Sequence, residues 1–422
     1  MFKKTVLPNG LRIITAPMHG TNTITVLVLC GTGSDYESND IRGMSHFLEH
    51  MFFKGTTKRP KQEMITEELT SMGSLHNAFT GHEMTGYYIK AGKTYLEQSL
   101  EILSDMYQNS VFPAEEIERE KQVIIEEMHD DHDTPTTYIW WIWEELLYGD
   151  QPAGWHIMGK ENIIRGFKRD DFVNYFYHQY VSSNTAIVVA GNFDEAKTTE
   201  LIKSLFGNLR SELPIRMKPF VKEVQTAPIS SIVVKKTDQT HITLGFRGLP
   251  ANHPDRYAAD ILGFILGGGM SSRMFQRIRE KMGLAYTVHT QHESSSNRGS
   301  LVTYAGVDHT NTERAISAML EEYRRITADR VPDAELKRVK DYVKGTTLIF
   351  LEASNAVADF IANEEILTGK PLTIDEIFAK IESVTPKDII LIAQKLIRND
   401  TLNLAILGPH EDKEKFEPLL KL

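Results

Sequence analysis

Apolar and polar positions follow strand-like and helix-like periods along the first half of the chain. The pattern predicts strands at about 4–17, 22–31 and 84–91, and helices at about 43–54, 61–72, 94–110 and 114–130. The stretch 139–147, IWWIWEELL, is strongly apolar and predicts a further helix. Its three tryptophans are more typical of a core or a domain contact than of a ligand site, so they receive no catalytic role.

A second pattern is internal repetition. Residues 168–191 align without gaps with 385–408, and each segment has an amphipathic helix, a polar turn, a strand and a closing glycine. The stretch 24–55 likewise resembles 242–269, with a strand, a turn with acidic residues and an apolar helix. Helices are expected after the first pair of segments, at 195–209 and 411–422. Two copies of one domain explain these parallels.

The repeat predicts an α+β fold of two duplicated α/β-sandwich domains, each a mostly antiparallel sheet packed with helices. The domains are expected at 1–212 and 213–422, each of a normal domain size. Their junction should fall in 211–219, SELPIRMKP, a proline-containing linker without periodicity.

Composition restricts the function further. The net charge of −10 argues against a nucleic-acid partner, because binding a polyanion requires a basic face. Cys30, the single cysteine, excludes an intramolecular disulfide and is expected to be a buried strand residue. The start, MFKKT, has no apolar signal region, and no stretch is long and apolar enough to span a membrane. We therefore expect a cytoplasmic enzyme with no membrane partner.

The candidate chemistry begins at His46-Phe47-Leu48-Glu49-His50, an H-x-x-E-H sequence. In a helix, His46 and His50 lie at i and i+4 on one face, where both imidazoles can hold one metal ion. The Glu49 carboxylate projects toward the same face and can accept a proton from water. The start of this helix is uncertain, because Ser45 is a possible cap but Gly43 precedes it. The alternative is that both histidines are ordinary core or surface residues.

Such a pair needs a third protein ligand, and the helix expected at 114–130 offers one. Glu120 and Glu127 lie seven residues apart, hence on one helix face. Glu127 is the candidate ligand and Glu120 a supporting carboxylate, although glutamates also decorate solvated helix faces. The charged run 129–133, HDDHD, is interpreted as a solvated helix end and not as a second metal site.

With these motifs the chain resembles the pitrilysin-type inverzincin peptidases, a family that includes the catalytic subunit of mitochondrial processing peptidase and small bacterial homodimeric peptidases. In that family a distant E-x-x-x-x-x-x-E glutamate completes H-x-x-E-H, and Glu120 through Glu127 matches. The resemblance implies that His46, His50 and Glu127 bind zinc and that Glu49 is the base.

The resemblance extends to substrate binding. Asn77, Ala78, Phe79 and Thr80 match the family's edge strand, which pairs with the peptide backbone. In the second half the glycine-rich segment 267–273 and the R-x-x-x-x-x-x-Y pair Arg279 and Tyr286 also match, and the pair is implied to contact substrate near the metal. From the residues alone, Arg279 would be a surface ion-pair residue and Tyr286 a buried strand residue. His76 and His82 depart from the family pattern, which puts the subsite preference in doubt.

The expected function is therefore that of a zinc metalloendopeptidase with one zinc per chain. The resemblance implies a homodimer that encloses peptides or unfolded segments in a clam-shell chamber. Two alternatives are a non-catalytic scaffold of the same fold and a processing-peptidase-like subunit that needs a different partner. Non-catalytic relatives usually lose metal residues, which this chain keeps.

Overall fold

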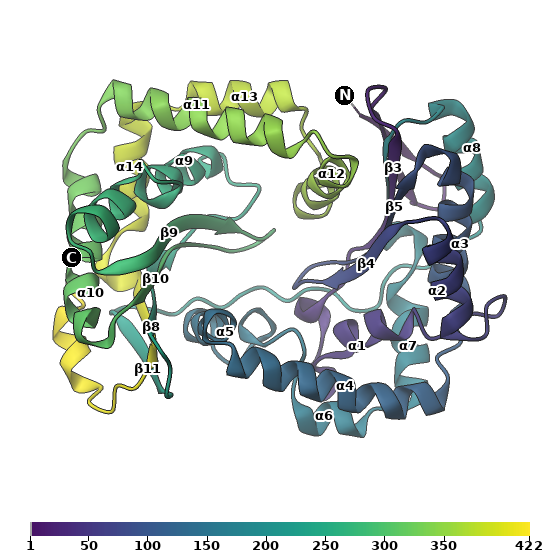
Figure 1. Cartoon of the computed structure of the whole chain (residues 1–422), viewed down its shortest axis with the longest axis horizontal. Coiled ribbons are helices and arrows are strands. Elements are labelled where there is room, and N and C mark those ends of the chain that lie inside the picture. The colour runs from purple at the N-terminus through teal and green to yellow at the C-terminus, as the bar shows by residue number, and fades with distance from the viewer. Residues whose placement is uncertain (1) are drawn as a thin grey trace. The chain divides into compact units, whose positions relative to one another are not determined.

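The computed structural model describes residues 2–422 and contains two β-sheets, each packed with helices (Figure 1). By their internal contacts the residues form two compact units. The first unit comprises the chain up to His129 together with Trp155–Pro219 and Leu348–Thr373, and the second comprises Asp130–Gly154, Phe220–Thr347 and Ile374–Leu422. The α+β class expected from the sequence is confirmed.

The first sheet has the strand order β1-β2-β6-β3-β5-β4. Its strands are β1 Lys3–Val6, β2 Arg12–Pro17, β3 Thr23–Cys30, β4 Leu75–Thr80, β5 Thr85–Gly92 and β6 Thr185–Gly191. Only β2 and β6 pair in parallel among these strands. The helices that lie wholly or mostly in this unit are α1 Met44–Met51, α2 Gln62–Ser71, α3 Leu96–Asn109, α4 Ala114–Asp133, α6 Glu161–Gly166, α7 Arg169–Gln179, α8 Glu195–Phe206 and α12 Ser354–Thr368.

The second sheet has the order β7-β11-β8-β10-β9, which repeats the order of the first sheet but, in the described part of the chain, without a counterpart of β1. Its strands are β7 Ile229–Val234, β8 Thr240–Arg247, β9 Ala285–Ser294, β10 Gly299–Val307 and β11 Leu402–Gly408. The helices are α5 Pro135–Tyr148, α9 Arg256–Gly267, α10 Thr312–Ala328, α11 Asp333–Phe350, α13 Ile374–Ser383 and α14 Pro386–Leu396, with a π-helical segment at Phe275–Lys281. Since β7 and β11 pair in parallel as β2 and β6 do, the predicted duplication is confirmed.

Both faces of the first sheet are buried, which explains the continuous apolar run of β3. Val26 and Val28 belong to the core that α1, α3 and α7 share, whereas Leu27 and Leu29 point to the opposite face. There they join a smaller core to which α12 contributes. Cys30 is buried in this strand, as expected.

Two helices join the sheet of the other half of the chain. Helix α5 precedes residue 212 but contacts β8 and β11, with Trp143 only 1% exposed in that core. Helix α12 follows residue 212 but contacts β3 and β6. All strands of the first sheet lie within the predicted domain 1–212 and all strands of the second within 213–422. The exchange of α5 and α12 was not predicted.

Three further sequence-based predictions can be compared with the structure. The expected strand at 4–17 is two strands, because a turn closes through Gly10 N–H donating to Leu7 O, with Gly10 at φ +87°. The helix expected at 411–422 is wrong in type: Glu414–Leu419 forms a short 3₁₀ helix that contains Pro418. The proline-containing linker holds no helix or strand between α8 and β7.

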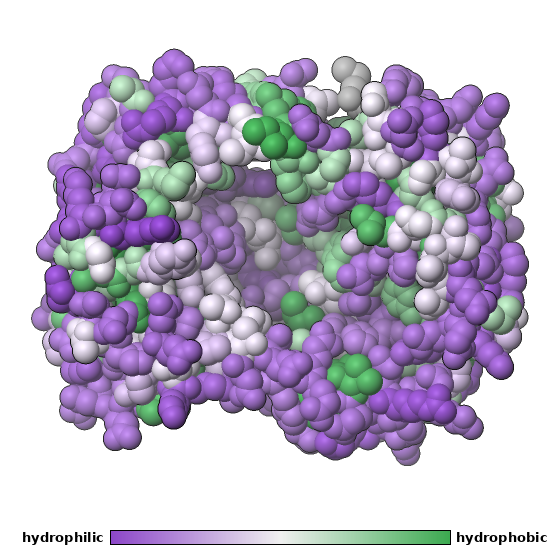
Figure 2. Space-filling model, in the orientation of Figure 1, coloured by the Kyte–Doolittle hydropathy of each residue, from purple (hydrophilic) through white to green (hydrophobic). Residues whose placement is uncertain are grey.

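The surface fits the acidic, charged composition. In the view of Figure 2 hydrophilic residues cover most of the visible face, with hydrophobic ones scattered among them. Within residues 2–422, every helix is too short or too polar to cross a bilayer.

Candidate metal centre

Helix α1 carries the H-x-x-E-H residues, and its start is fixed by a residue outside the helix. The N-cap is Gly43, at φ +91°, where a Cβ would lie 2.3 Å from Met158 O. Both oxygens of the Glu37 carboxylate accept hydrogen bonds, from Gly43 N and Ser45 N at 2.7 Å each. Glu37 thus satisfies amides that helix geometry leaves unpaired, and it sets where the helix begins.

The structure brings together three side chains with metal-ligating atoms. Potential ligand atoms of His46, His50 and Glu127 all lie within 4.8 Å of one another. Glu127 Oε2 is 3.8 Å from His46 Nε2 and 3.5 Å from His50 Nε2. Helix α4 supplies Glu127, so the metal-ligating atoms come from two helices of the first unit. The charged run 129–133 lies at the end of α4 and is largely exposed, as expected.

The cluster fits a zinc ion by donor chemistry and spacing. Tetrahedral zinc takes imidazole and carboxylate ligands at about 2.0–2.2 Å, which separates neighbouring ligand atoms by roughly 3.3–3.5 Å. Burial, with a smaller effect from His50, lowers the pKa of His46 to about 3. Its imidazole is therefore neutral at neutral pH and has a lone pair to donate.

Glu120 holds the second imidazole in place. His50 Nδ1 is 2.9 Å from Glu120 Oε1, which directs Nε2 toward Glu127. Glu120 is buried and also pairs with Lys54 at 2.7 Å. Burial opposes ionisation of Glu120, but the bonds from His50 and Lys54 outweigh it and lower its pKa. Lys54 was not predicted from the sequence, although it lies only four residues after His50, just beyond the end of α1.

Glu49 lies beside the cluster with one oxygen anchored. The Thr80 hydroxyl donates to Glu49 Oε2 at 2.7 Å. Burial raises the pKa of Glu49, against the lowering effect of the Thr80 hydrogen bond. A carboxylate in these surroundings is suited to accept a proton.

Strand β4 places the predicted substrate segment next to these groups. It is the last strand in the sheet order and pairs with β5 through Asn77↔Tyr88 and Thr80↔Thr85. One open hollow is lined by the cluster and this strand: His46, Glu49, His50, Phe53, Lys54, Asn77, Ala78, Phe79, Thr80, Glu120 and Glu127. An edge strand beside the His-His-Glu cluster can pair with an extended peptide.

His76, in β4, and His82, in the turn after β4, each have a serine hydroxyl close to one ring nitrogen. His76 Nδ1 is 3.1 Å from Ser74 Oγ, and His82 Nδ1 is 2.9 Å from Ser34 Oγ. Both contacts are local to the ends of β4.

Arg279 and Tyr286 belong to the second unit, where the structure brings them together. Arg279 lies in the π-helical segment, with its guanidinium carbon 4.9 Å from the centroid of the Tyr286 ring. Tyr286 is in β9, as the sequence predicted, but it is 75% exposed and not buried.

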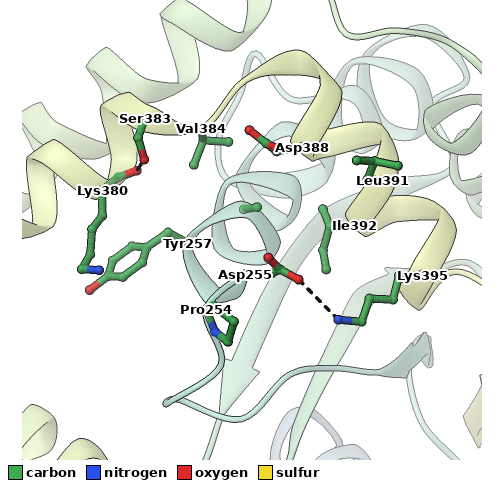
Figure 3. Close-up of a pocket in the computed structure, with 11 residues that line it drawn as sticks. Pro254, Asp255, Tyr257, Lys380, Ser383, Val384, Asp388, Leu391, Ile392 and Lys395 are labelled. Atoms are coloured by element: carbon green, nitrogen blue, oxygen red, sulfur yellow. Dashed lines mark hydrogen bonds and ion pairs between the residues drawn. The ribbon is translucent and has the colours of Figure 1, made fainter.

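A separate hollow in the second unit lies among α9, α13 and α14 (Figure 3). Its charged residues already have partners: Lys395 pairs with Asp255 at 3.3 Å, and Asp388 accepts the Thr385 hydroxyl at 2.7 Å. The Lys380 ammonium lies 5.6 Å from the ring of Tyr257. We assign this hollow no chemistry.

The fold thus combines two sheets of related topology with a His-His-Glu cluster that can hold a metal ion. The sequence model named Insulinase (Peptidase family M16) matches residues 12–159, and the one named Peptidase M16 inactive domain matches residues 166–343. The chain belongs to the M16 peptidase family, as its resemblance to the pitrilysin type predicted.

Two relatives agree with this assignment, and one solved structure shares the fold. An uncharacterized zinc protease of Rickettsia felis is 34% identical over 97% of this chain and 98% of that protein. The uncharacterized zinc protease YmxG of Bacillus subtilis is 32% identical, with the same coverage of each chain. The fold matches a protease from Helicobacter pylori, with a TM-score of 0.89, 23% identity, and coverage of 97% of this chain and 99% of that chain.

Proposed function

We propose that this chain is a zinc-dependent endopeptidase that cleaves peptides and unfolded polypeptide segments. The observation that carries the proposal is the His46, His50 and Glu127 cluster beside the Glu49 carboxylate. The zinc protease names of the relatives support a metal of this kind, and we propose one ion per chain.

Zinc, when bound, supplies Lewis acidity that activates water near neutral pH and polarises a carbonyl. The chain's own residues do the rest. Glu49 accepts the proton of the attacking water and passes it to the leaving amine. The peptide lies extended along Asn77, Ala78, Phe79 and Thr80 through backbone hydrogen bonds. Because backbone pairing is indifferent to side chains, cleavage is broad and favours unfolded segments.

Arg279 and Tyr286 complete the proposal by family resemblance. The Tyr286 hydroxyl donates to the developing oxyanion and Arg279 contacts substrate. The proposed working form is a homodimer whose chains enclose the substrate. The competing function is a non-catalytic scaffold. The family model that matches residues 166–343 is named an inactive domain, and this name is compatible with both functions.

Zinc analysis and hydrolysis of a quenched peptide by the purified chain test the proposal. Glu49→Gln should keep zinc but lose roughly 10²–10⁴-fold in kcat, since it removes the proton acceptor. Glu63→Gln, an exposed glutamate of α2, is the matched control and should be unchanged. A wild-type chain that binds zinc yet cleaves nothing supports the scaffold, and loss of zinc in Glu49→Gln makes Glu49 a ligand instead.

A further inference from the structure

The segment between α8 and β7 is unusual, because its large apolar side chains are exposed while the side chain of one lysine is largely covered. Leu213, Ile215 and Met217 are 78%, 66% and 75% exposed. The side chain of Lys218, in contrast, is only 11% exposed. Burial of apolar side chains therefore does not hold this segment in position. Its polar contacts hold it instead.

Lys218 lies against two buried carboxylates. Its ammonium contacts Glu83 directly and is 3.6 Å from Asp35 Oδ2. Glu83 is 5% exposed and Asp35 1% exposed. Asp35 Oδ1 also lies 3.5 Å from His82 Nδ1. Removing the Lys218 ammonium would take a positive charge away from two buried carboxylates, which is unfavourable.

These carboxylates belong to two loops that pack backbone to backbone. Glu83 is in the turn 81–84 that joins β4 to β5, and Asp35 is in the loop after β3. Asp35 N donates to His82 O at 2.9 Å. A Cβ at Gly33 would lie 2.1 Å from Gly81 O, so the loops approach this closely only because position 33 is glycine. Lys218 thus fastens this turn through a side chain on each loop.

The turn begins immediately after Thr80, the residue whose hydroxyl holds Glu49. The contacts therefore run without a gap from Lys218, through Glu83 and the turn, to Thr80 and the Glu49 carboxylate. Each link is a direct contact or an adjacent residue within the first unit.

We propose that Thr80 and Lys218 are positioning residues for Glu49. The Thr80 hydroxyl occupies one carboxylate oxygen and leaves the other to face the attacking water. Lys218 keeps the turn, and hence Thr80, where this hydrogen bond forms. The inference rests on the proposed role of Glu49 as proton acceptor, and neither residue touches the reacting atoms.

The Thr80 link is tested with two variants at saturating zinc. Thr80→Val keeps the shape but removes the donor, and should lower kcat roughly 10–100-fold through misplacement of the base. KM and zinc content should stay unchanged. Thr80→Ser retains a hydroxyl and should recover most of the rate. An unimpaired Thr80→Val, or a Thr80→Ser as slow as Thr80→Val, overturns the link.

The Lys218 link is tested by a double-mutant cycle. Lys218→Met should lower kcat, and combining it with Thr80→Val should cost little more than Thr80→Val alone, because both break one path. Lys218→Arg should retain activity, and Lys61→Met, at an exposed lysine of the same unit, is the control. Multiplied losses in the double variant would show that Lys218 acts independently of Thr80 and would overturn its role.

Hydrogen exchange of the metal-free protein gives a readout without catalysis. The amides of Gly81 and Asp35, bonded to Met84 O and His82 O, should exchange faster in Lys218→Met than in wild type. Unchanged exchange rates in Lys218→Met would overturn the anchoring of the turn. If Lys218→Met folds poorly, Glu83→Gln tests the same contact and should speed up exchange of the same two amides. A wild-type chain that cleaves no peptide would refute the proposed function, and with it the positioning of Glu49 for catalysis. The exchange rates test separately whether Lys218 anchors the turn.

Discussion

The two glutamates on α4 that approach His50 have different surroundings. Glu127 is 42% exposed at its side chain and points an oxygen at both imidazoles, whereas Glu120 is 7% exposed and bonded to His50 and Lys54. We therefore propose Glu127 as a ligand and Glu120 as the group that orients the His50 ligand.

Replacement by glutamine should separate these roles. Glu127→Gln removes a charged ligand and should abolish stoichiometric zinc binding. Glu120→Gln should weaken zinc roughly 10–100-fold, the usual effect of an outer-shell partner. Titration with a competing chelator measures both, and Glu126→Gln, an exposed neighbour on the same helix, should match wild type. Equal zinc affinity in Glu127→Gln and wild type would remove Glu127 from the ligand set.

For single residues, the sequence predicted the arrangement of side chains that lie within one turn of the same helix. His46, Glu49 and His50 share a face because of the 3.6-residue period, and the family pattern located Glu127. The bond from Thr80 to Glu49 was not predicted, since residues 31 positions apart meet only once the sheet has formed.

At the scale of helices and strands, the start of α1 is capped by a residue that the sequence next to the helix does not indicate. The sequence pattern indicated Ser45 or Gly43 at the start of the helix. The acceptor for the amides of Gly43 and Ser45 is instead Glu37, six and eight residues earlier. Its side chain is buried in the loop before the helix, with Glu37 4% exposed. Only the folded loop brings it to the helix end, so a search of the usual cap positions misses it.

Glu37 should also give the stability of the chain a pH dependence. Burial raises the pKa of Glu37 to about 7 from 4.5, against the lowering effect of the hydrogen bonds from Ser45 and Gly43. The folded state is thus favoured while Glu37 is protonated. This contribution is complete below pH 4.5 and is lost as the pH rises through about 7.

Urea unfolding of metal-free wild type and Glu37→Gln, from pH 4.5 to 7.5, measures this contribution. The unfolding free energy of wild type minus that of Glu37→Gln should fall as the pH rises, by at most about 1.4 kcal/mol per pH unit. The difference cancels the other titrating groups, which both proteins share. A difference that is constant across the range, or that grows with pH, would contradict the assignment.

For the whole molecule, the proposal requires a contribution from the second unit. Tyr286 is 75% exposed, so loss of its hydroxyl should not disturb the fold. Tyr286→Phe should keep zinc and melting temperature but lower the rate on the order of 10–10³-fold, as loss of an oxyanion donor does. Tyr342→Phe, at another exposed tyrosine of the second unit, is the control in the same peptide assay. An unimpaired Tyr286→Phe would leave the second unit without this catalytic role.

Helix α12 comes from the second half of the sequence but covers one face of the first sheet, so the stability of that sheet depends on residues far along the chain. Ile14, Leu27 and Leu29 form one core with Ile361 and Ala362 of α12. A fragment of residues 1–212 exposes that face to water, at a cost of about 1.5–3 kcal/mol for each large side chain that stays uncovered. Because folded proteins are stable by only about 5–15 kcal/mol, several such losses are decisive.

The fragment 1–212 should therefore associate or bind a hydrophobic dye, hold zinc weakly at best and cleave no peptide. Adding a peptide of residues 348–373 in trans should restore a cooperative unfolding transition and zinc binding, because it returns α12 to its face of the sheet. The same peptide with Ile361→Asp should fail, since a carboxylate cannot be buried there unpaired. Calorimetry and zinc titration of the three mixtures check this. A monomeric fragment 1–212 that unfolds cooperatively and binds zinc like the full chain would show that α12 covers the sheet without stabilising it.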